Sequence, residues 1–279
     1  MKIIIVGGVA GGMSAATRLR RLMEDAEIII FEKGPFVSFA NCGLPYYVSG
    51  EIANRDSLLV QTPESLRARF NLDVRPFHEV VQISPEEHNV TVRHDGQEFT
   101  ESYDKLILSP GAKPFVPTIE GLAEAKNAYT LRNVPDLDEI MAALDNHPKE
   151  AVVIGAGFIG LEMAENLAKR GLQVTIVEKA PHVLPPLDQE MAAFVQAELL
   201  ANGVRVITSQ SATRFEDQGK VIALENGQKI TSDLTILSVG VEPENGLAKA
   251  AGIELGLRGG ILVDEHYETS QKDIFAVGD

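Results

Sequence analysis

Cys42 is the residue whose type and setting best suit chemistry, because it is the only cysteine among 279 residues. It lies in residues 38–47, SFANCGLPYY, which are rich in loop formers, and loops on a rigid scaffold commonly carry reactive groups. A lone cysteine is often a small buried hydrophobe. Here Asn41 is placed to cap a short turn that opens at Cys42, where free N–H groups favour a thiolate. Pro45 fits only the first turn, so the pattern predicts a redox-active thiol.

A nucleotide-binding unit precedes this thiol. The apolar run 2–6 is followed by a glycine-rich turn, by helix-forming residues 13–23 and by a second apolar run, 27–31, which ends at Glu32. The turn contains Gly7, Gly8, Gly11 and Gly12. This order is typical of a βαβ unit, with a strand, glycines, a helix, a strand and an acid. Such a unit binds a pyrophosphate at the helix N-terminus and a ribose at the acid. The fingerprint is incomplete, since Val9 takes the place of its second glycine.

The same order occurs again later with a complete G-x-G-x-x-G motif. Its glycines are Gly155, Gly157 and Gly160. The apolar run 151–154 precedes them, helix-forming residues 161–170 follow, and the next strand, 173–177, ends at Glu178. This match predicts a nicotinamide dinucleotide site. Glu178 favours NADH because a carboxylate repels a 2′-phosphate, whereas Lys179 leaves NADPH possible.

The elements around both motifs follow one plan. Residues 74–100 surround the turn signal Asp95-Gly96, and residues 220–231 surround Asn226-Gly227, so each unit is expected to carry an antiparallel meander. Residues 103–108 and 234–239 then form apolar strands that end near Gly111 and Gly240. We therefore expect an α/β protein with two Rossmann-like domains, the second inserted in the first. The expected bounds are 1–115 with 246–279 for the first domain and 116–245 for the second, with strands at 260–263 and 273–277 rejoining the first.

Composition excludes several classes of protein. The 30.2 kDa chain has room for two domains. A net charge of −15 argues against a nucleic-acid partner. No apolar run reaches the roughly 18 residues of a membrane span, and a single cysteine fits a reducing compartment, so a cytoplasmic protein is expected. The six histidines show no metal-ligand spacing. A basic group at Arg18, Arg20 and Arg21, with Arg67 and Arg69, is compatible with either a phosphate site or a solvated helix face.

Four stretches together resemble the FAD-dependent pyridine nucleotide-disulfide oxidoreductases over the whole chain. They are residues 6–12, VGGVAGG; 103–111, YDKLILSPG; 153–162, VIGAGFIGLE; and 269–279, TSQKDIFAVGD. Residues 38–47 are similar to the single-cysteine branch of coenzyme A disulfide reductases and NADH-dependent persulfide or polysulfide reductases. NADH oxidases and peroxidases of that branch have a similar segment, usually without Ala40-Asn41.

The resemblance implies a role for each matching residue. Contacts to FAD are implied for the loop Gly7, Gly8, Val9, Ala10, Gly11 and Gly12, and for Glu32, Lys33, Asn41, Val80, Ser109, Gly111, Arg132 and Asp279. Contacts to NAD(P)H are implied for Gly155, Gly157, Ile159, Gly160, Glu162 and Glu178, with Phe158 covering the flavin. Contacts to coenzyme A are implied for Ser14, Arg18, Arg21, Ser38 and Asn41.

The implied activity passes electrons from NAD(P)H through flavin to Cys42, which reduces coenzyme A disulfide or a coenzyme A persulfide or polysulfide. The alternatives are an NADH oxidase or peroxidase that uses a Cys42 sulfenic acid, and a non-enzymatic flavoprotein sensor. The last strand ends on Gly278-Asp279, a turn that normally leads into a helix. We therefore expect a longer polypeptide. The resemblance implies a homodimer whose C-terminal dimerisation domain is absent from this sequence, as is any sulfurtransferase domain.

Overall fold

The computed structural model describes all of residues 1–279, which fall by their internal contacts into two compact units. Unit 1 consists of residues 1–40, 59–113 and 242–279, and unit 2 consists of residues 41–58 and 114–241. The expected domains differ from these units mainly in residues 41–58. Those residues were expected in the first domain, whereas their contacts place them in unit 2.

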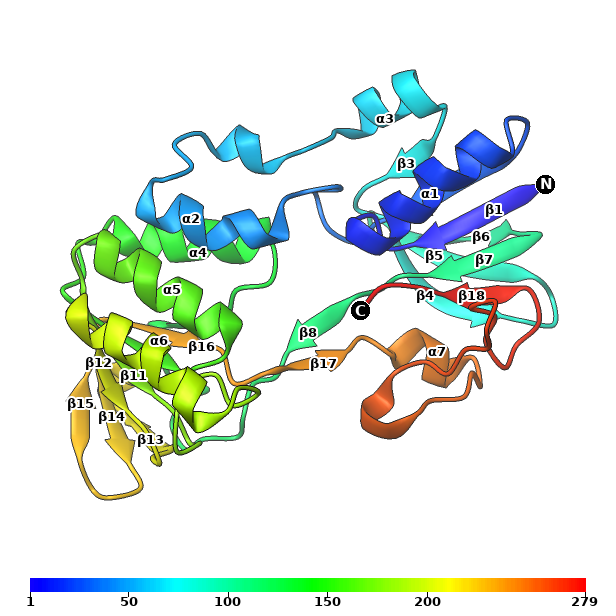
Figure 1. Cartoon of the computed structure of the whole chain (residues 1–279). Helices are drawn as coiled ribbons and strands as arrows, with labels where there is room; N and C mark the ends of the chain where they lie inside the picture. The colour runs from blue at the N-terminus through cyan, green and yellow to red at the C-terminus, as the bar shows by residue number, and fades with distance from the viewer. The chain divides into compact units, whose positions relative to one another are not determined.

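Unit 1 is built on a five-stranded parallel sheet with the order β18-β7-β1-β2-β3 (Figure 1). The strands are β1 (Lys2–Val6), β2 (Glu27–Phe31), β3 (Asp73–Arg75), β7 (Lys105–Leu108) and β18 (Ile274–Ala276). Side chains of a strand alternate between its two faces, and both faces are covered here. Ile4 and Val6 therefore enter one core, while Ile3 and Ile5 enter the other. This explains why β1 and β2 are continuous runs of apolar residues.

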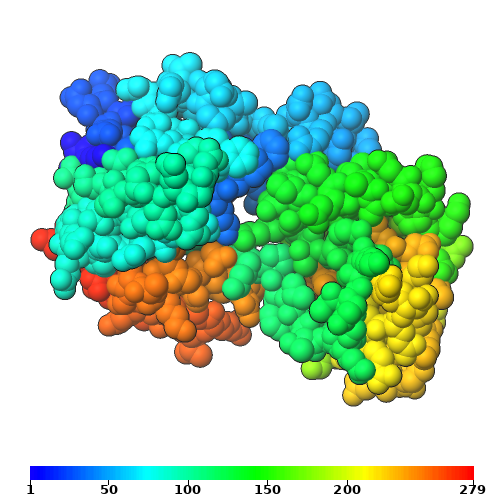
Figure 2. All heavy atoms as spheres, turned by 180° about the vertical axis from the view of Figure 1, so that it is seen from behind, coloured from blue at the N-terminus to red at the C-terminus, as the bar shows by residue number.

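Helices cover one face of this sheet and an antiparallel meander covers the other. The helices are α1 (Ala10–Leu22) and α3 (Pro63–Phe70), and the meander consists of β4 (Glu79–Ser84), β5 (Asn89–His94) and β6 (Gln97–Ser102). Met13 and Leu66 pack in the helical core, and Val90 packs in the meander core. A short helix, α7 (Gly246–Ala250), packs beside β4, and Figure 2 shows this orange segment against the blue-green meander.

Unit 2 repeats this architecture on the sheet β12-β11-β10-β16-β9, which is also parallel. The strands are β9 (Ala128–Tyr129), β10 (Glu150–Ile154), β11 (Gln173–Val177), β12 (Arg205–Ile207) and β16 (Leu234–Leu237). The helices are α2 (Leu44–Ser49), α4 (Val134–Leu144), α5 (Phe158–Lys169) and α6 (Gln189–Ala201). A meander of β13 (Ala212–Glu216), β14 (Val221–Leu224) and β15 (Lys229–Thr231) packs through Phe215 and Ile222 against Val152.

The two-domain α/β fold with parallel sheets and paired meanders is therefore as expected. Short strands β8 (Ala112–Pro114) and β17 (Val241–Pro243) lie where the chain passes between the units, and 3₁₀ turns occupy Asn41–Gly43, Arg55–Leu58, Asp217–Gly219 and Leu257–Gly259. One expected strand is wrong. Residues 260–263 form only isolated bridges, Ile261 with Leu255 and Val263 with Thr269, because no strand of the sheet lies beside them.

Candidate functional site

The first glycine turn is packed too closely for side chains at its key positions. Gly7 has φ +104°, and a Cβ there would lie 1.9 Å from the carbonyl oxygen of Ser109. A Cβ at Gly12 would lie 1.9 Å from the carbonyl oxygen of Gly7. Both positions therefore require glycine, and Val9, the departure from the fingerprint, sits at the start of α1 where its side chain is accommodated.

The second glycine turn repeats this geometry. Gly155 has φ +102°, and its Cβ would lie 2.4 Å from the carbonyl oxygen of Ser238. A Cβ at Gly160 would lie 2.1 Å from the carbonyl oxygen of Gly155. Gly157 differs, since a Cβ there would meet nothing within 4 Å. The space beside Gly157 is what a close approach of a pyrophosphate to the backbone requires.

The acid at the end of each second strand is held over its glycine turn by two backbone amides. Glu32 accepts hydrogen bonds from the N–H groups of Gly8 and Gly34, both at 2.8 Å. Glu178 accepts them from Ala156 at 2.6 Å and from Ala180 at 2.7 Å. Each carboxylate oxygen keeps a lone pair for a further donor, so both acids are oriented in advance for ribose hydroxyls.

The helices that follow the two glycine turns begin without side-chain caps. Neither α1 nor α5 has a capping hydrogen bond or an acidic residue in its first turn. Helices α3 and α4, by contrast, begin with capping boxes at Thr62 and Asn133. The N–H groups of α1 and α5 are thus available to an anion. These observations fit the pyrophosphate and ribose of a dinucleotide in each unit.

Three chain segments of unit 1 meet at the carboxyl edge of its sheet. A Cβ on Gly11 would lie 2.5 Å from Oγ of Ser109 and 3.3 Å from Cα of Gly278. The expected flavin residues Gly11, Ser109 and Asp279 therefore lie on converging loops, at the point where α/β sheets bind ligands. Lys33 is exposed and forms an ion pair with Glu244 at 3.8 Å. Val80 is buried in β4, so only its backbone is available to a ligand.

The remaining expected flavin residues do not all lie in unit 1. Gly111 has φ +73° and its carbonyl accepts a hydrogen bond from Glu244. Arg132 belongs to unit 2, where its N–H donates to Asp136 at 2.7 Å. Asn41 also belongs to unit 2 and is exposed.

The basic residues of α1 separate into two groups. Ser14, Arg18 and Arg21 form one exposed stripe, and neither arginine makes a hydrogen bond or an ion pair. Arg20 points elsewhere, because its guanidinium donates to the carbonyl oxygens of Phe70, Met23, Glu24 and Asn71. Arg20 therefore fastens α1 to the end of α3, while Arg18 and Arg21 remain available to an anionic ligand.

Cys42 is exposed, in a 3₁₀ turn that leads into α2. Pro45 lies in the first turn of α2, as expected, but the cap differs from the expectation. Asn41 is itself inside the 3₁₀ turn, and the N-cap of α2 is Gly43, which has no side chain with which to cap. Ser38, just before this segment, has φ +48° and donates its N–H to the carbonyl oxygen of Gly8 at 2.9 Å.

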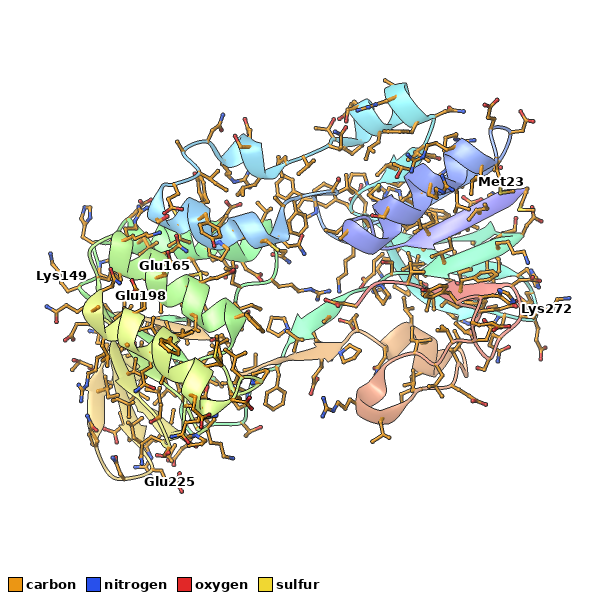
Figure 3. The ribbon with its side chains drawn as sticks, in the orientation of Figure 1. Met23, Lys149, Glu165, Glu198, Glu225 and Lys272 are labelled. Carbon is orange, nitrogen blue, oxygen red and sulfur yellow. The ribbon has the colours of Figure 1, made fainter.

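Charged residues of α5 flank this cysteine segment inside unit 2. Figure 1 shows α2 alongside α4 and α5. Burial, followed by the charge of Glu165, raises the pKa of Glu162. The charge of Glu162 in turn raises the pKa of Tyr46 on α2. Glu165, labelled in Figure 3, forms an ion pair with Lys169 at 2.7 Å. Phe158, the first residue of α5, is 66% exposed and is free to cover a flat ring.

Two contacts of the cysteine segment have no local signal in the sequence. Arg55 donates two hydrogen bonds to the carboxylate of Asp138, at 2.8 and 2.6 Å. Arg170 donates to the carbonyl oxygen of Val48 at 2.9 Å. The partners are 83 and 122 positions apart, so only the folded chain brings them together.

Comparison with known proteins gives a consistent match over the whole chain. A family model described as pyridine nucleotide-disulphide oxidoreductase matches residues 1–279. The coenzyme A disulfide reductase of Staphylococcus haemolyticus is 36% identical over 282 residues, covering 100% of this chain and 62% of that protein. The NADH oxidase of Methanocaldococcus jannaschii is 36% identical over 283 residues, covering 100% of this chain and 63% of that protein.

Solved structures match equally well. Reduced CoADR-RHD of Bacillus anthracis superposes with a TM-score of 0.99 at 52% identity, covering 100% of this chain and 50% of that one. An NAD-dependent persulfide reductase from A. fulgidus has a TM-score of 0.97 at 36% identity, covering 100% and 53%. The chain thus spans between half and two thirds of the length of these relatives. None of its helices combines the length and apolar composition needed to cross a bilayer.

Proposed function

The chain belongs to the pyridine nucleotide-disulphide oxidoreductase family, and from this premise we propose that it passes electrons from NADH through FAD to Cys42 to reduce coenzyme A disulfide or a coenzyme A persulfide. FAD and a nicotinamide dinucleotide are the cofactors of this family. The observation that carries the proposal is the combination of two matching glycine turns, each with an acid held by backbone amides, and one exposed thiol.

The residues of unit 1 would hold FAD and those of unit 2 would hold NADH. The open N-terminus of α1 and the carboxylate of Glu32 suit the pyrophosphate and ribose of FAD, and those of α5 and Glu178 suit NADH. When bound, FAD accepts a hydride from the nicotinamide and supplies an electron pair to sulfur. Only three residues separate Cys42 from Ser38, whose backbone is bonded to the first glycine turn, and this short tether supports delivery to the thiol.

The chemistry of Cys42 requires no second cysteine. Its thiolate would attack one sulfur of coenzyme A disulfide, which forms a mixed disulfide and releases one coenzyme A thiolate. Two electrons and a proton then break the mixed disulfide, which restores Cys42 and releases the second coenzyme A. The balance is NADH + H⁺ + CoAS–SCoA → NAD⁺ + 2 CoASH. The exposed stripe of Ser14, Arg18 and Arg21 would bind the phosphates of coenzyme A.

A second candidate function is an NADH oxidase or peroxidase in which Cys42 cycles through a sulfenic acid. The similarity to the NADH oxidase of M. jannaschii favours it, and an exposed lone thiol suits this chemistry as well. The dipeptide Ala40-Asn41 before the cysteine favours reduction of coenzyme A disulfide or persulfide over the oxidase or peroxidase.

We propose further that the full-length protein works as a homodimer in the cytoplasm. The lone free thiol supports a reducing compartment. Analytical ultracentrifugation measures the oligomeric state.

The deciding experiment combines a Cys42→Ser variant with mass spectrometry of the oxidised wild-type protein. In the variant, NADH should still bleach the bound flavin while coenzyme A disulfide turnover disappears. Oxidised wild type should carry a coenzyme A adduct on Cys42, whereas a sulfenic acid would support the oxidase or peroxidase. Undiminished disulfide turnover by Cys42→Ser would overturn the role of Cys42, and a bound flavin that NADH cannot reduce would indicate a sensor.

A further inference from the structure

The cysteine segment, residues 41–58, is too short to hold its own shape. Its only α-helix, α2, is six residues long, and isolated helices shorter than roughly 12 residues are marginal in water. The position of Cys42, just before this helix, therefore depends on what α2 packs against.

Apolar contacts with the rest of unit 2 supply part of that support. Leu44, Val48 and Leu58 are 2%, 0% and 0% exposed, although Cys42 itself is exposed. The helices beside α2 are α4 and α5. Apolar packing is non-directional, so it keeps the segment attached without fixing its orientation closely.

Directional contacts in the middle of the segment and near its C-terminal end supply the rest. Arg170, just after α5, donates to the carbonyl oxygen of Val48, in the last turn of α2. Lys169 forms an ion pair with Glu51 at 2.5 Å. At the far end, Arg55 makes the two-bond pair with Asp138 of α4. Paired N–H···O bonds between planar groups define an orientation as well as a distance.

The Arg55–Asp138 pair is poorly placed to serve stability alone. Its side chains are 30% and 45% exposed, and ion pairs at such sites typically contribute only about 0–1 kcal/mol. The pair joins residues that are 83 positions apart in the chain through two hydrogen bonds. It is better explained by a role in fixing the orientation of the segment. The helix α5 carries the nucleotide turn at one end and Arg170 at the other, so one element supports both the hydride donor site and the thiol segment.

We propose that Arg55, Asp138 and Arg170 are positioning residues for Cys42, which hold its segment in one orientation on α4 and α5 for the reduction of sulfur. This proposal rests on the proposed function for its kinetic consequence. Loosening the pair would leave the dinucleotide sites intact and would displace the thiol. A misplacement of about 1 Å can slow a reaction by as much as about 100-fold.

The test uses Arg55→Gln and Asp138→Asn in the FAD-loaded protein and follows the two half-reactions separately by rapid mixing. Reduction of the flavin by NADH should keep its wild-type rate, while reoxidation by coenzyme A disulfide should slow by about tenfold or more. The double variant Arg55→Asp with Asp138→Arg should recover most of that rate. Arg214→Gln is the matched control, because it removes an exposed ion pair of unit 2, with Glu120 at 2.9 Å, away from the segment.

Hydrogen exchange gives a readout that does not depend on activity. Amides of α2 should exchange faster in Arg55→Gln, Asp138→Asn and Arg170→Gln, and should be unchanged in Arg214→Gln. Unaltered α2 exchange, or a sulfur step as fast as that of the control, would overturn the proposal. If wild type reduces no coenzyme A disulfide, the proposed function fails, whereas the exchange result still tests the fastening of the segment.

Discussion

Glu178 and Glu32 are single carboxylates held at the two proposed dinucleotide sites. Each is fixed by two backbone amides, so neither would have to be reoriented to meet the proposed ribose. This pre-organisation lowers the entropic cost of binding. It also makes the carboxylate a strict selector, because a held charge cannot turn away from a 2′-phosphate.

The first prediction concerns the choice between NADH and NADPH. Wild type should prefer NADH by about tenfold or more in kcat/KM, since juxtaposed like charges typically cost several kcal/mol. Glu178→Gln should reduce that ratio by weakening NADH and relieving NADPH. Lys179 is exposed, so Lys179→Gln should leave the ratio unchanged. A clear NADPH preference in wild type would mean that the ribose pocket has been misplaced.

The second prediction concerns Glu162, whose pKa is raised chiefly by burial. A carboxyl with a raised folded-state pKa destabilises the fold when it is ionised, so stability falls as the pH rises above its ordinary value of 4.5. Glu162→Gln should therefore raise the Tm at neutral pH, and the gain should vanish below about pH 4. The same change should weaken NADH use, a trade-off common at functional positions. Thermal scans at both pH values check the sign, and a lower Tm at neutral pH would contradict it.

At the scale of single elements, α1 combines two tasks on different faces. Its N-terminus offers free N–H groups, and its last turns carry basic residues. Arg20 is used within the fold, whereas Arg18 and Arg21 are not. One short helix can therefore serve a cofactor at its end and a second ligand along its side.

The third prediction separates these arginines. Arg18→Gln and Arg21→Gln should each raise the KM for coenzyme A disulfide by about tenfold or more with little change in Tm, because charge-assisted bonds to phosphate typically contribute about 1.5–3 kcal/mol. Arg20→Gln should instead lower the Tm with little change in the KM for coenzyme A disulfide, because it leaves carbonyl groups at the end of α3 without their donor. Parallel kinetics and thermal unfolding of the three variants decide this. If only Arg20→Gln raised the KM for coenzyme A disulfide, the ligand would have been assigned to the wrong face of α1.

At the scale of the whole molecule, the two units share one architecture but differ in the chain segments that they contain. Each has a five-stranded parallel sheet, a glycine turn, a held acid and a meander. Unit 2 additionally contains residues 41–58, a segment inserted between two stretches of unit 1. The thiol is thus carried by the unit that is proposed to bind NADH.

The fourth prediction tests that assignment with a fragment of residues 114–241. This fragment lacks Leu44, Val48 and Leu58, each of which is almost fully buried in the whole chain. Losing such a side chain from an apolar site costs roughly 1.5–3 kcal/mol, so the fragment should unfold at lower denaturant and bind more of a hydrophobic dye. Adding a synthetic peptide of residues 41–58 should reverse part of both effects. A fragment as stable as the intact unit would show that the segment is not part of it.

The sequence by itself determined the order of strand, glycine turn, helix and acid in both units, because these signals are local and obey the period of each element. The strands 2–6, 27–31 and 173–177 have the expected bounds. The capping pair Asn133 and Asp136, with Pro135 in the first turn, is a local signal of the same kind for α4, a helix that was not expected. Cys42 stood out because it is unique.

Only the tertiary structure decided which partners distant residues take. The direction of Arg20, the membership of residues 41–58 in unit 2 and the pair Arg55–Asp138 all depend on contacts between segments far apart in the chain. The same holds for the missing Asn41 cap, since packing of α2 sets where its first turn begins. Spacing reports on neighbours along an element, whereas these choices are made by side-chain packing and hydrogen bonds across the fold.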